Sequence, residues 1–177
     1  MKTHNGGGWY YGFLQHIAML VRPGLYVEFG VDQGESARLV APFAEKMALV
    51  DATAARPAWV PPDQFYQMTT EEFSKKVLRE LGDIDMAFID ADHSYKAAQD
   101  DFVRLEPKVP QDGFILIHDT YPENQAMTAP GYSGDSWRLP DWLRELRTPT
   151  WDVLTLPFPP GLTLCRRRGA FPLVWMK

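Results

Sequence analysis

The sequence predicts an α/β protein in which helices cover both faces of a mostly parallel sheet. Short apolar segments alternate with helical segments between residues 25 and 119, a pattern typical of parallel strands joined by crossover helices. The last two apolar segments are separated only by a turn, and strands joined in this way are antiparallel neighbours. The chain of 177 residues is long enough for one domain with a substantial core. We therefore expect a single domain over residues 1–177, built on a doubly wound seven-stranded sheet whose last strand is antiparallel.

An entry loop and a helix are expected in residues 1–24. Apolar residues recur at helical spacing between Trp9 and Leu20, and the sequence Arg-Pro-Gly at 22–24 ends this helix.

Five strands and three helices are predicted next. The strand candidates are residues 25–30, 47–51, 64–68, 85–90 and 113–119, and the helices between them are residues 34–46, 69–81 and 94–109. Pro42 falls inside the first of these helices, which is therefore either kinked there or ends at Ala41. Thr70, followed by two glutamates, is predicted to cap the second helix, and Asp92 or Ser94 the third.

The tail of the chain changes character. A loop-rich, aromatic segment at residues 120–140 is the expected substrate loop, with Tyr121, Tyr132 and Trp137 as contacts; the alternative is that these residues only pack the loop onto the core. A short helix at 138–147 and two strands at 151–157 and 161–167 follow. The turn between these strands is too short for a crossover helix, so we expect five or six parallel strands and one reversed strand at the end of the sheet.

Composition excludes several classes of function. The net charge of -5 and the pI near 5.3 argue against a broad nucleic-acid-binding surface. The single cysteine excludes an intramolecular disulfide and a cysteine zinc cluster. The N-terminus has no signal-peptide layout and no apolar run is long enough to cross a bilayer, so a cytoplasmic protein without a membrane partner is expected.

The first strand ends in a turn that indicates a small-molecule site. Residues 28–34 have the pattern E-x-G-x-x-x-G, in which Gly30 and Gly34 permit a tight turn and a close ligand. A dinucleotide fingerprint has a glycine where this chain has Asp32, and acids at 28 and 32 would repel a phosphate. The two acids suit a ligand whose nearby end is cationic, although the pattern by itself also describes a simple tight turn.

An acid at the end of the second strand extends this interpretation. Asp51 lies where a carboxylate can accept hydrogen bonds from both hydroxyls of a ribose. A nucleoside joined to a zwitterionic amino acid, without phosphate, satisfies all of these groups. S-adenosylmethionine is such a molecule.

A second group of polar residues follows the fourth and fifth strands. Asp90 closes one strand and His118-Asp119 the next, while Asp92 and His93 lie in the loop between them. Neighbouring parallel strands end at the same edge, so Asp90 and Asp119 should face each other. A capping role for Asp92 and a half-buried structural role for His118 are the simpler alternatives.

These motifs resemble those of class I S-adenosylmethionine-dependent methyltransferases, which have a Rossmann-like fold. The resemblance rests on the sequences "EFGV" at 28–31, "GES" at 34–36, "FIDADHSY" at 88–95 and "DGFILIHD" at 112–119. It is greatest with a small-molecule O-methyltransferase branch in which "IDxDHxY" and "GGxxxxHD" recur, and it covers residues 25 to about 121.

The resemblance implies a role for each cofactor-site residue. Glu28 and Gly30 would contact the methionine part of the cofactor with Ser36 nearby, and Asp90 would lie near the sulfonium. Asp51 would bind the ribose and Thr69 would border the adenine.

Related catechol-type enzymes hold a divalent metal on an acid after strand four and an Asp-Asn pair after strand five. Here the pair is His118-Asp119, so Asp90 and Asp119, alone or with His118, could hold Mg²⁺ or a softer divalent ion such as Mn²⁺, and a metal-free site is the alternative.

The expected function is transfer of a methyl group to an oxygen, less favourably a nitrogen, of a small-molecule acceptor such as a sugar or natural product. His93 first and His118 second are the candidate general bases, because imidazole has a pKa near neutrality. The acceptor site could be open, or it could be completed by Trp9, Tyr10 and a second subunit in a homodimer. The alternatives are an NAD-dependent oxidoreductase and a non-catalytic, cofactor-binding protein.

Overall fold

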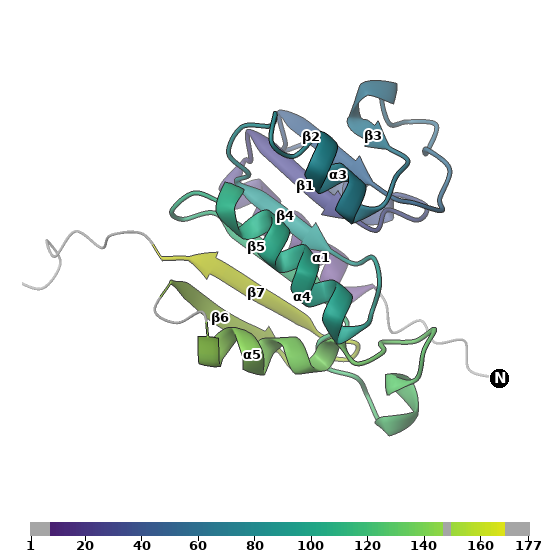
Figure 1. Cartoon of the computed structure of the whole chain (residues 1–177), viewed down its shortest axis with the longest axis vertical. Helices are drawn as coiled ribbons and strands as arrows, with labels where there is room; N and C mark the ends of the chain where they lie inside the picture. Colours follow the sequence, from purple (N-terminus) through teal and green to yellow (C-terminus); the bar gives the residue numbers. More distant parts are fainter. Residues whose placement is uncertain (1–7, 147–149, 169–177) are drawn as a thin grey trace, which may run out of the picture.

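A computed structural model describes residues 8–146 and 150–168 of the chain. Seven strands form one sheet in the order β3-β2-β1-β4-β5-β7-β6 (Figure 1). The strands are β1 (Leu25–Phe29), β2 (Lys46–Val50), β3 (Phe65–Tyr66), β4 (Met86–Ile89), β5 (Phe114–His118), β6 (Trp151–Leu156) and β7 (Leu162–Arg167). The α-helices are α1 (Trp9–Val21), α2 (Glu35–Val40), α3 (Thr70–Lys76), α4 (Tyr95–Leu105) and α5 (Leu139–Leu146). Short 3-10 helices lie at Pro62–Gln64, Glu106–Lys108, Gln125–Thr128 and Ser136–Arg138.

The predicted topology is confirmed, with one addition. Strands β1 to β5 pair in parallel, and β7 pairs antiparallel with both β5 and β6. The reversed strand is the last in the chain, as expected, but it lies between β5 and β6 and leaves β6 at the edge of the sheet. A hairpin can enter a sheet with either strand first, and the turn at 157–161 does not determine which one pairs with β5.

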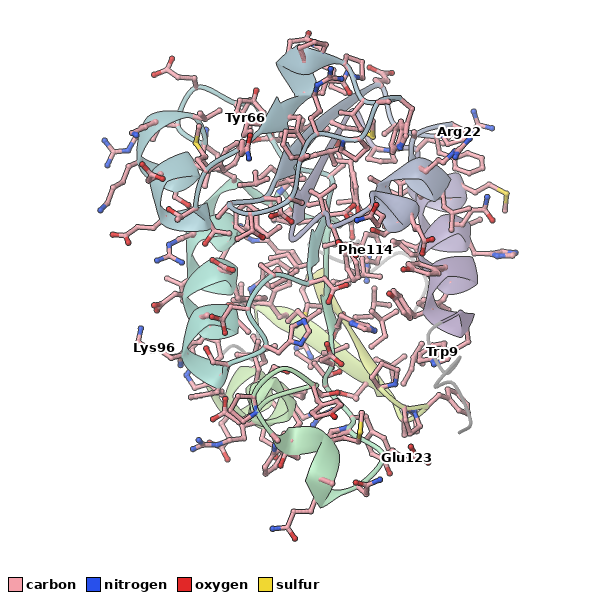
Figure 2. All side chains as sticks on the ribbon, turned by 90° about the vertical axis from the view of Figure 1, so that its right-hand side faces the viewer. Trp9, Arg22, Tyr66, Lys96, Phe114 and Glu123 are labelled. Atoms are coloured by element: carbon pink, nitrogen blue, oxygen red, sulfur yellow. The ribbon has the colours of Figure 1, made fainter. Side chains whose placement is uncertain are left out.

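Helices cover both faces of the sheet. One core packs Phe73 of α3, Phe102 of α4 and Leu143 of α5 against the sheet, and the other packs Leu14 of α1 and Ala37 of α2. Figure 2 shows the two layers, with α1 at Trp9 on one side of the sheet and α4 at Lys96 on the other. Among the helices of the described residues, none is long and apolar enough to cross a membrane.

Two helix ends differ from the sequence predictions. Helix α2 ends at Val40, before Pro42, so the chain takes the shorter of the two predicted courses. Helix α3 is capped by Thr69 and not by Thr70: the Thr69 hydroxyl accepts from Glu72 N, and the Glu72 carboxylate accepts from Thr69 N. The sequence Thr-Thr-Glu-Glu offers two registers for a cap, and only Thr69 has a glutamate at the third helical position.

Register brings the ends of four strands together. Phe29 of β1 is level with Val50 of β2 and Ile89 of β4, and Ile89 is level with Ile117 of β5. The next residue of each strand therefore lies at the same edge of the sheet, and these residues are Gly30, Asp51, Asp90 and His118. The strand order reverses on either side of β1, which is where ligands bind in open α/β sheets.

Candidate active site

The glycines of the first turn are required by its geometry. Gly30 has a φ of 86° and Gly34 a φ of 75°, values that favour glycine. A Cβ on Gly30 would lie 2.1 Å from the carbonyl oxygen of Asp90, and one on Gly34 would lie 2.9 Å from Pro57. The turn therefore packs directly against the end of β4, and neither position accepts a side chain without displacing backbone or ring atoms.

Glu28 is fully buried beneath this turn. Its Oε2 accepts a 2.7 Å hydrogen bond from the Tyr26 hydroxyl, and its Oε1 accepts a short one from the Ser36 hydroxyl. Burial raises the pKa of Glu28 to about 8, although the two hydroxyl donors oppose this effect. The acid ahead of the first glycine is therefore a neutral carboxylic acid at neutral pH, and it holds the start of α2 through Ser36.

Asp51 joins two loops at the end of β2. Its Oδ2 accepts from Val31 N at 2.9 Å and Asp32 N at 3.1 Å, and its Oδ1 accepts from Thr53 N and Ala54 N. Burial favours the neutral acid, but these four backbone donors outweigh it and lower the pKa of Asp51 to about 2. The carboxylate is thus ionised, and the first N–H groups of the turn are bound to it.

The remaining predicted residues have mainly structural contacts. Thr69 is exposed and caps α3, at the same edge of the sheet as Asp51. Of the two cap candidates for α4, Ser94 accepts from Ala97 N, while Asp92 accepts from Ser94 N in the preceding turn.

Four side chains form one cluster at the ends of β4 and β5, and all four were predicted from the sequence. Nδ1 of His118 lies 2.9 Å from Oδ1 of Asp90 and 3.2 Å from Oδ2 of Asp119. Nδ1 of His93 lies 3.2 Å from the same Oδ2 of Asp119, and its Nε2 lies 3.6 Å from Oδ1 of Asp90. We call Asp90, His93, His118 and Asp119 the Asp–His cluster.

The charges of the Asp–His cluster balance. The carboxylate of Asp90, helped by that of Asp119, raises the pKa of His93 to about 9 against the opposing effect of burial. Burial lowers the pKa of His118, but the same two carboxylates outweigh it and raise that pKa to about 10. Burial raises the pKa of Asp119, whereas the two histidines and the Ser133 hydroxyl lower it below its ordinary value on balance. Both histidines are therefore cationic near neutral pH.

Helix α1 closes one side of the cluster. The ring of Tyr10 lies against that of His118, with centroids 4.1 Å apart and planes tilted by 38°. Nε2 of His118 is buried and has no hydrogen-bond partner among the described residues. His118 is thus enclosed, with a side chain 9% exposed, whereas that of His93 is 35% exposed.

Part of the predicted substrate loop also reaches the cluster, which the sequence pattern did not predict. Ser133 donates to Oδ1 of Asp119 at 2.7 Å, and the carbonyl oxygen of Tyr132 lies 2.6 Å from Nδ1 of His93. Small polar residues are common in loops, so the sequence Tyr-Ser-Gly-Asp-Ser at 132–136 carries no signal of these contacts. Tyr10 was expected to help complete the acceptor site, but its contact with His118 was not predicted, since it has the spacing of an ordinary core residue of α1.

The donor set of the cluster fits a divalent cation. Asp90, His93 and Asp119 each offer one ligand atom, and these atoms lie within 4.8 Å of one another. Carboxylate oxygens suit Mg²⁺ and Mn²⁺, while imidazole nitrogen suits Zn²⁺ and other transition metals, so the mixed set favours Mn²⁺ over Mg²⁺.

Exposed aromatic side chains surround this edge of the sheet. Tyr121, Tyr132 and Trp137 of the 120–140 segment are 46%, 54% and 42% exposed, and Phe158 of the β6–β7 turn is 59% exposed. Trp9 joins this group, since its Nε1 donates to Pro159 O at 3.0 Å and its ring meets that of Phe158 edge-on.

The fold of the chain is similar to the folds of several methyltransferases of known structure. It is similar to an O-methyltransferase from Bacillus cereus in complex with SAH, with a TM-score of 0.72, 12% identity and coverage of 94% of this chain and 84% of that one. The O-methyltransferase TomG from Streptomyces achromogenes, involved in tomaymycin synthesis and in complex with SAM, gives a TM-score of 0.70, 16% identity and coverage of 90% and 80%. The MycE methyltransferase of the mycinamycin biosynthetic pathway, in complex with Mg and SAH, gives a TM-score of 0.67 and 17% identity. The match covers 92% of this chain and 50% of that one.

At these identities the structural likeness shows the fold, and the family is shown by the sequence. No curated protein sequence matches the chain significantly. A family model described as a methyltransferase domain matches residues 27–120, which is more than half of the chain and includes the turn after β1 and the whole Asp–His cluster. The chain therefore belongs to this methyltransferase domain family.

Proposed function

We propose that the chain is an S-adenosylmethionine-dependent methyltransferase that modifies an oxygen, or less favourably a nitrogen, of a small-molecule acceptor such as a sugar or natural product. The observation that carries this proposal is the contact between the Gly30 turn and the end of β4. Because no atom fits between Gly30 and the Asp90 carbonyl, a ligand held by the turn lies beside the Asp–His cluster. Cofactor and acceptor chemistry would then meet at one edge of the sheet.

The charges around the turn favour a cofactor without phosphate. In dinucleotide-binding folds the first N–H groups of the turn face the pyrophosphate, but here Val31 N and Asp32 N donate to Asp51. Asp51 and Asp90 place negative charge where a ribose and a sulfonium would lie, and this argues against the NAD-dependent alternative. When bound, S-adenosylmethionine supplies an electrophilic methyl group on a sulfonium.

The cofactor-site residues are proposed to have the roles that the family resemblance implies. Asp51 would exchange part of its hydrogen bonding with the 53–54 loop for the ribose hydroxyls, and Thr69 would border the adenine at the start of α3. Glu28, buried with Ser36, would respond to the ammonium group by giving up its proton.

A divalent cation would be held by Asp90, Asp119 and His93. It would bind an acceptor hydroxyl and make that hydroxyl more acidic. The proposal of a metal ion rests on these three ligand atoms, and the presence of Mg in the MycE structure agrees with it.

In a metal-free site, His93 is the preferred general base and His118 the second candidate, and either ring must first lose the proton that it carries near neutral pH. His93 is the more exposed of the two, and its Nδ1 faces a carbonyl oxygen, so that Nε2 carries the lone pair whenever the ring is neutral. Enclosed by Tyr10, His118 is better placed to hold Asp90 and Asp119 together than to reach an acceptor.

The acceptor would bind over the aromatic residues of the 120–140 segment. Exposed rings of Tyr121, Tyr132 and Trp137, continued by Phe158 and Trp9, offer apolar faces to a small molecule. We also propose that the protein acts in the cytoplasm without nucleic acid or membrane, and that a homodimer could complete this surface.

Calorimetry with S-adenosylhomocysteine and NADH tests the cofactor, and a screen of sugar and phenolic acceptors with labelled S-adenosylmethionine tests the reaction. We expect binding heat with S-adenosylhomocysteine and none with NADH. We also expect methyl transfer, at a rate that His93→Ala and Asp119→Asn each reduce by at least about 100-fold. Lys75→Ala on the exposed face of α3 is the control. Absence of heat with S-adenosylhomocysteine at millimolar concentration would refute the proposal. If S-adenosylhomocysteine binds but no methyl transfer that depends on His93 or Asp119 is found, the non-catalytic alternative would be favoured.

A further inference from the structure

Residues 132–136, with the sequence Tyr-Ser-Gly-Asp-Ser, contact the Asp–His cluster and its surroundings through every member. We call these residues the 132–136 segment. Tyr132 presents its carbonyl oxygen to His93 Nδ1, and Ser133 donates to Asp119 Oδ1. Asp135 accepts from Tyr95 N at the start of α4, and Ser136 donates both to the His93 carbonyl and, through its hydroxyl, to the Asp119 carbonyl. These hydrogen bonds fix the 132–136 segment to the cluster and to the start of α4.

Ser133 determines which oxygen of Asp119 faces the imidazoles. Its hydroxyl binds Oδ1, and Oδ2 is then the atom 3.2 Å from Nδ1 of both His93 and His118. Ser133 is 3% exposed and Asp119 5%, so water cannot readily replace this donor. Asp119 has a φ of 59°, and the Ser136 hydroxyl holds its carbonyl in this left-handed conformation.

The segment also determines the proton position on His93. A carbonyl oxygen only accepts hydrogen bonds, so Nδ1 of His93 at 2.6 Å from Tyr132 O carries hydrogen. When the ring is neutral, Nε2, at 3.6 Å from Asp90, is the atom that can bind a proton or a cation. A Cβ on Gly134 would lie 2.2 Å from the His93 carbonyl, so this approach depends on glycine.

We propose that the 132–136 segment positions the Asp–His cluster, and that Ser133 is the positioning residue which orients Asp119 and, through Asp119 and the Tyr132 carbonyl, keeps the proton of His93 on Nδ1. Its importance for catalysis rests on the proposed function. Partners of this kind around a ligand or a catalytic imidazole change metal affinity or activity by about 10- to 100-fold when removed.

Three variants separate positioning from folding. Ser133→Ala removes the hydroxyl without adding volume, and Ser133→Thr keeps a hydroxyl. Thr128→Ala is the matched control, because this hydroxyl lies in the same part of the chain but donates only to Gln125 O. Thermal unfolding of each variant shows whether the fold is retained.

The deciding measurement is nitrogen NMR of the histidine rings of the whole chain, with His93→Asn for assignment. In wild type and Thr128→Ala, we expect the His93 ring hydrogen on Nδ1 to be protected from exchange. In Ser133→Ala we expect at least about a tenfold loss of this protection, with recovery in Ser133→Thr. Titration with Mn²⁺ alone should show a parallel loss of affinity of about 10- to 100-fold in Ser133→Ala.

Exchange and Mn²⁺ binding in Ser133→Ala that match Thr128→Ala would overturn the proposal. A folded Ser133→Thr that behaves like Ser133→Ala would also overturn it, since the hydroxyl would not be the cause. None of these measurements requires S-adenosylmethionine, so failure of the methyltransferase proposal would be recognised separately, by absent binding of S-adenosylhomocysteine to wild type.

Discussion

Replacement of the buried Glu28 by glutamine should change how the stability of the protein depends on pH. The pKa of Glu28 is about 8 in the folded protein, against 4.5 for an ordinary glutamate, because the carboxyl group is buried. The folded state therefore keeps a proton that the unfolded chain has released. The stabilisation that comes from this difference is fully present below pH 4.5 and is lost as the pH rises through about 8.

The expected magnitude follows from this pKa difference. Between pH 5.5 and 7.5, both inside the window, the free energy of unfolding of the wild type should fall by about 1.4 kcal/mol per pH unit from this group, or about 3 kcal/mol in total. Glutamine resembles the protonated acid in size; its Oε1 can accept from one of the Tyr26 and Ser36 hydroxyls, and its Nε2 can donate to the oxygen of the other. Glu28→Gln should therefore gain about 3 kcal/mol relative to wild type over this interval.

Urea unfolding at pH 5.5, 6.5 and 7.5 measures this difference. Glu80→Gln, which removes an exposed carboxylate, is the control, and its stability should follow the wild type throughout. Parallel curves for wild type and Glu28→Gln would refute the reasoning, because they would mean that Glu28 is already ionised in the folded protein at pH 5.5.

The remaining predictions concern the turn, the cap and the metal. Gly30→Ala should lower the free energy of unfolding by about 2–5 kcal/mol and abolish S-adenosylhomocysteine binding, because a Cβ meets the Asp90 carbonyl at a positive φ. Gly12→Ala, with nothing within 4 Å, should instead be neutral or stabilising by up to about 1 kcal/mol in the same urea assay. Thr69→Ala should cost about 1 kcal/mol through loss of the capping box; no change in its urea midpoint would contradict that role. Removal of metal with EDTA should abolish methyl transfer, with recovery on addition of Mn²⁺ or Mg²⁺, and full activity after metal removal would leave a metal-free mechanism.

Much of the candidate site was predictable because its residues are placed by local patterns. Alternating apolar strands and helices predict parallel strands, and parallel strands end at one edge. Asp51, Asp90 and Asp119 directly follow strand ends and His118 is the last residue of β5, so their meeting at this edge follows from the strand pattern and the register of the sheet. The position of His93 was also predictable, because it lies in the short loop directly after β4.

Long-range packing decided the rest. Whether β6 or β7 pairs with β5 depends on how the final hairpin docks, and the turn between them is the same in both arrangements. Tyr132 contacts His93 across 39 positions of the chain, and Tyr10 reaches His118 from the first helix. The burial of Glu28 depends on α1 and α2 covering that face of the sheet. Such contacts join segments with no shared periodicity, so the sequence determined which groups end at the edge, and only tertiary packing decided their protonation and orientation.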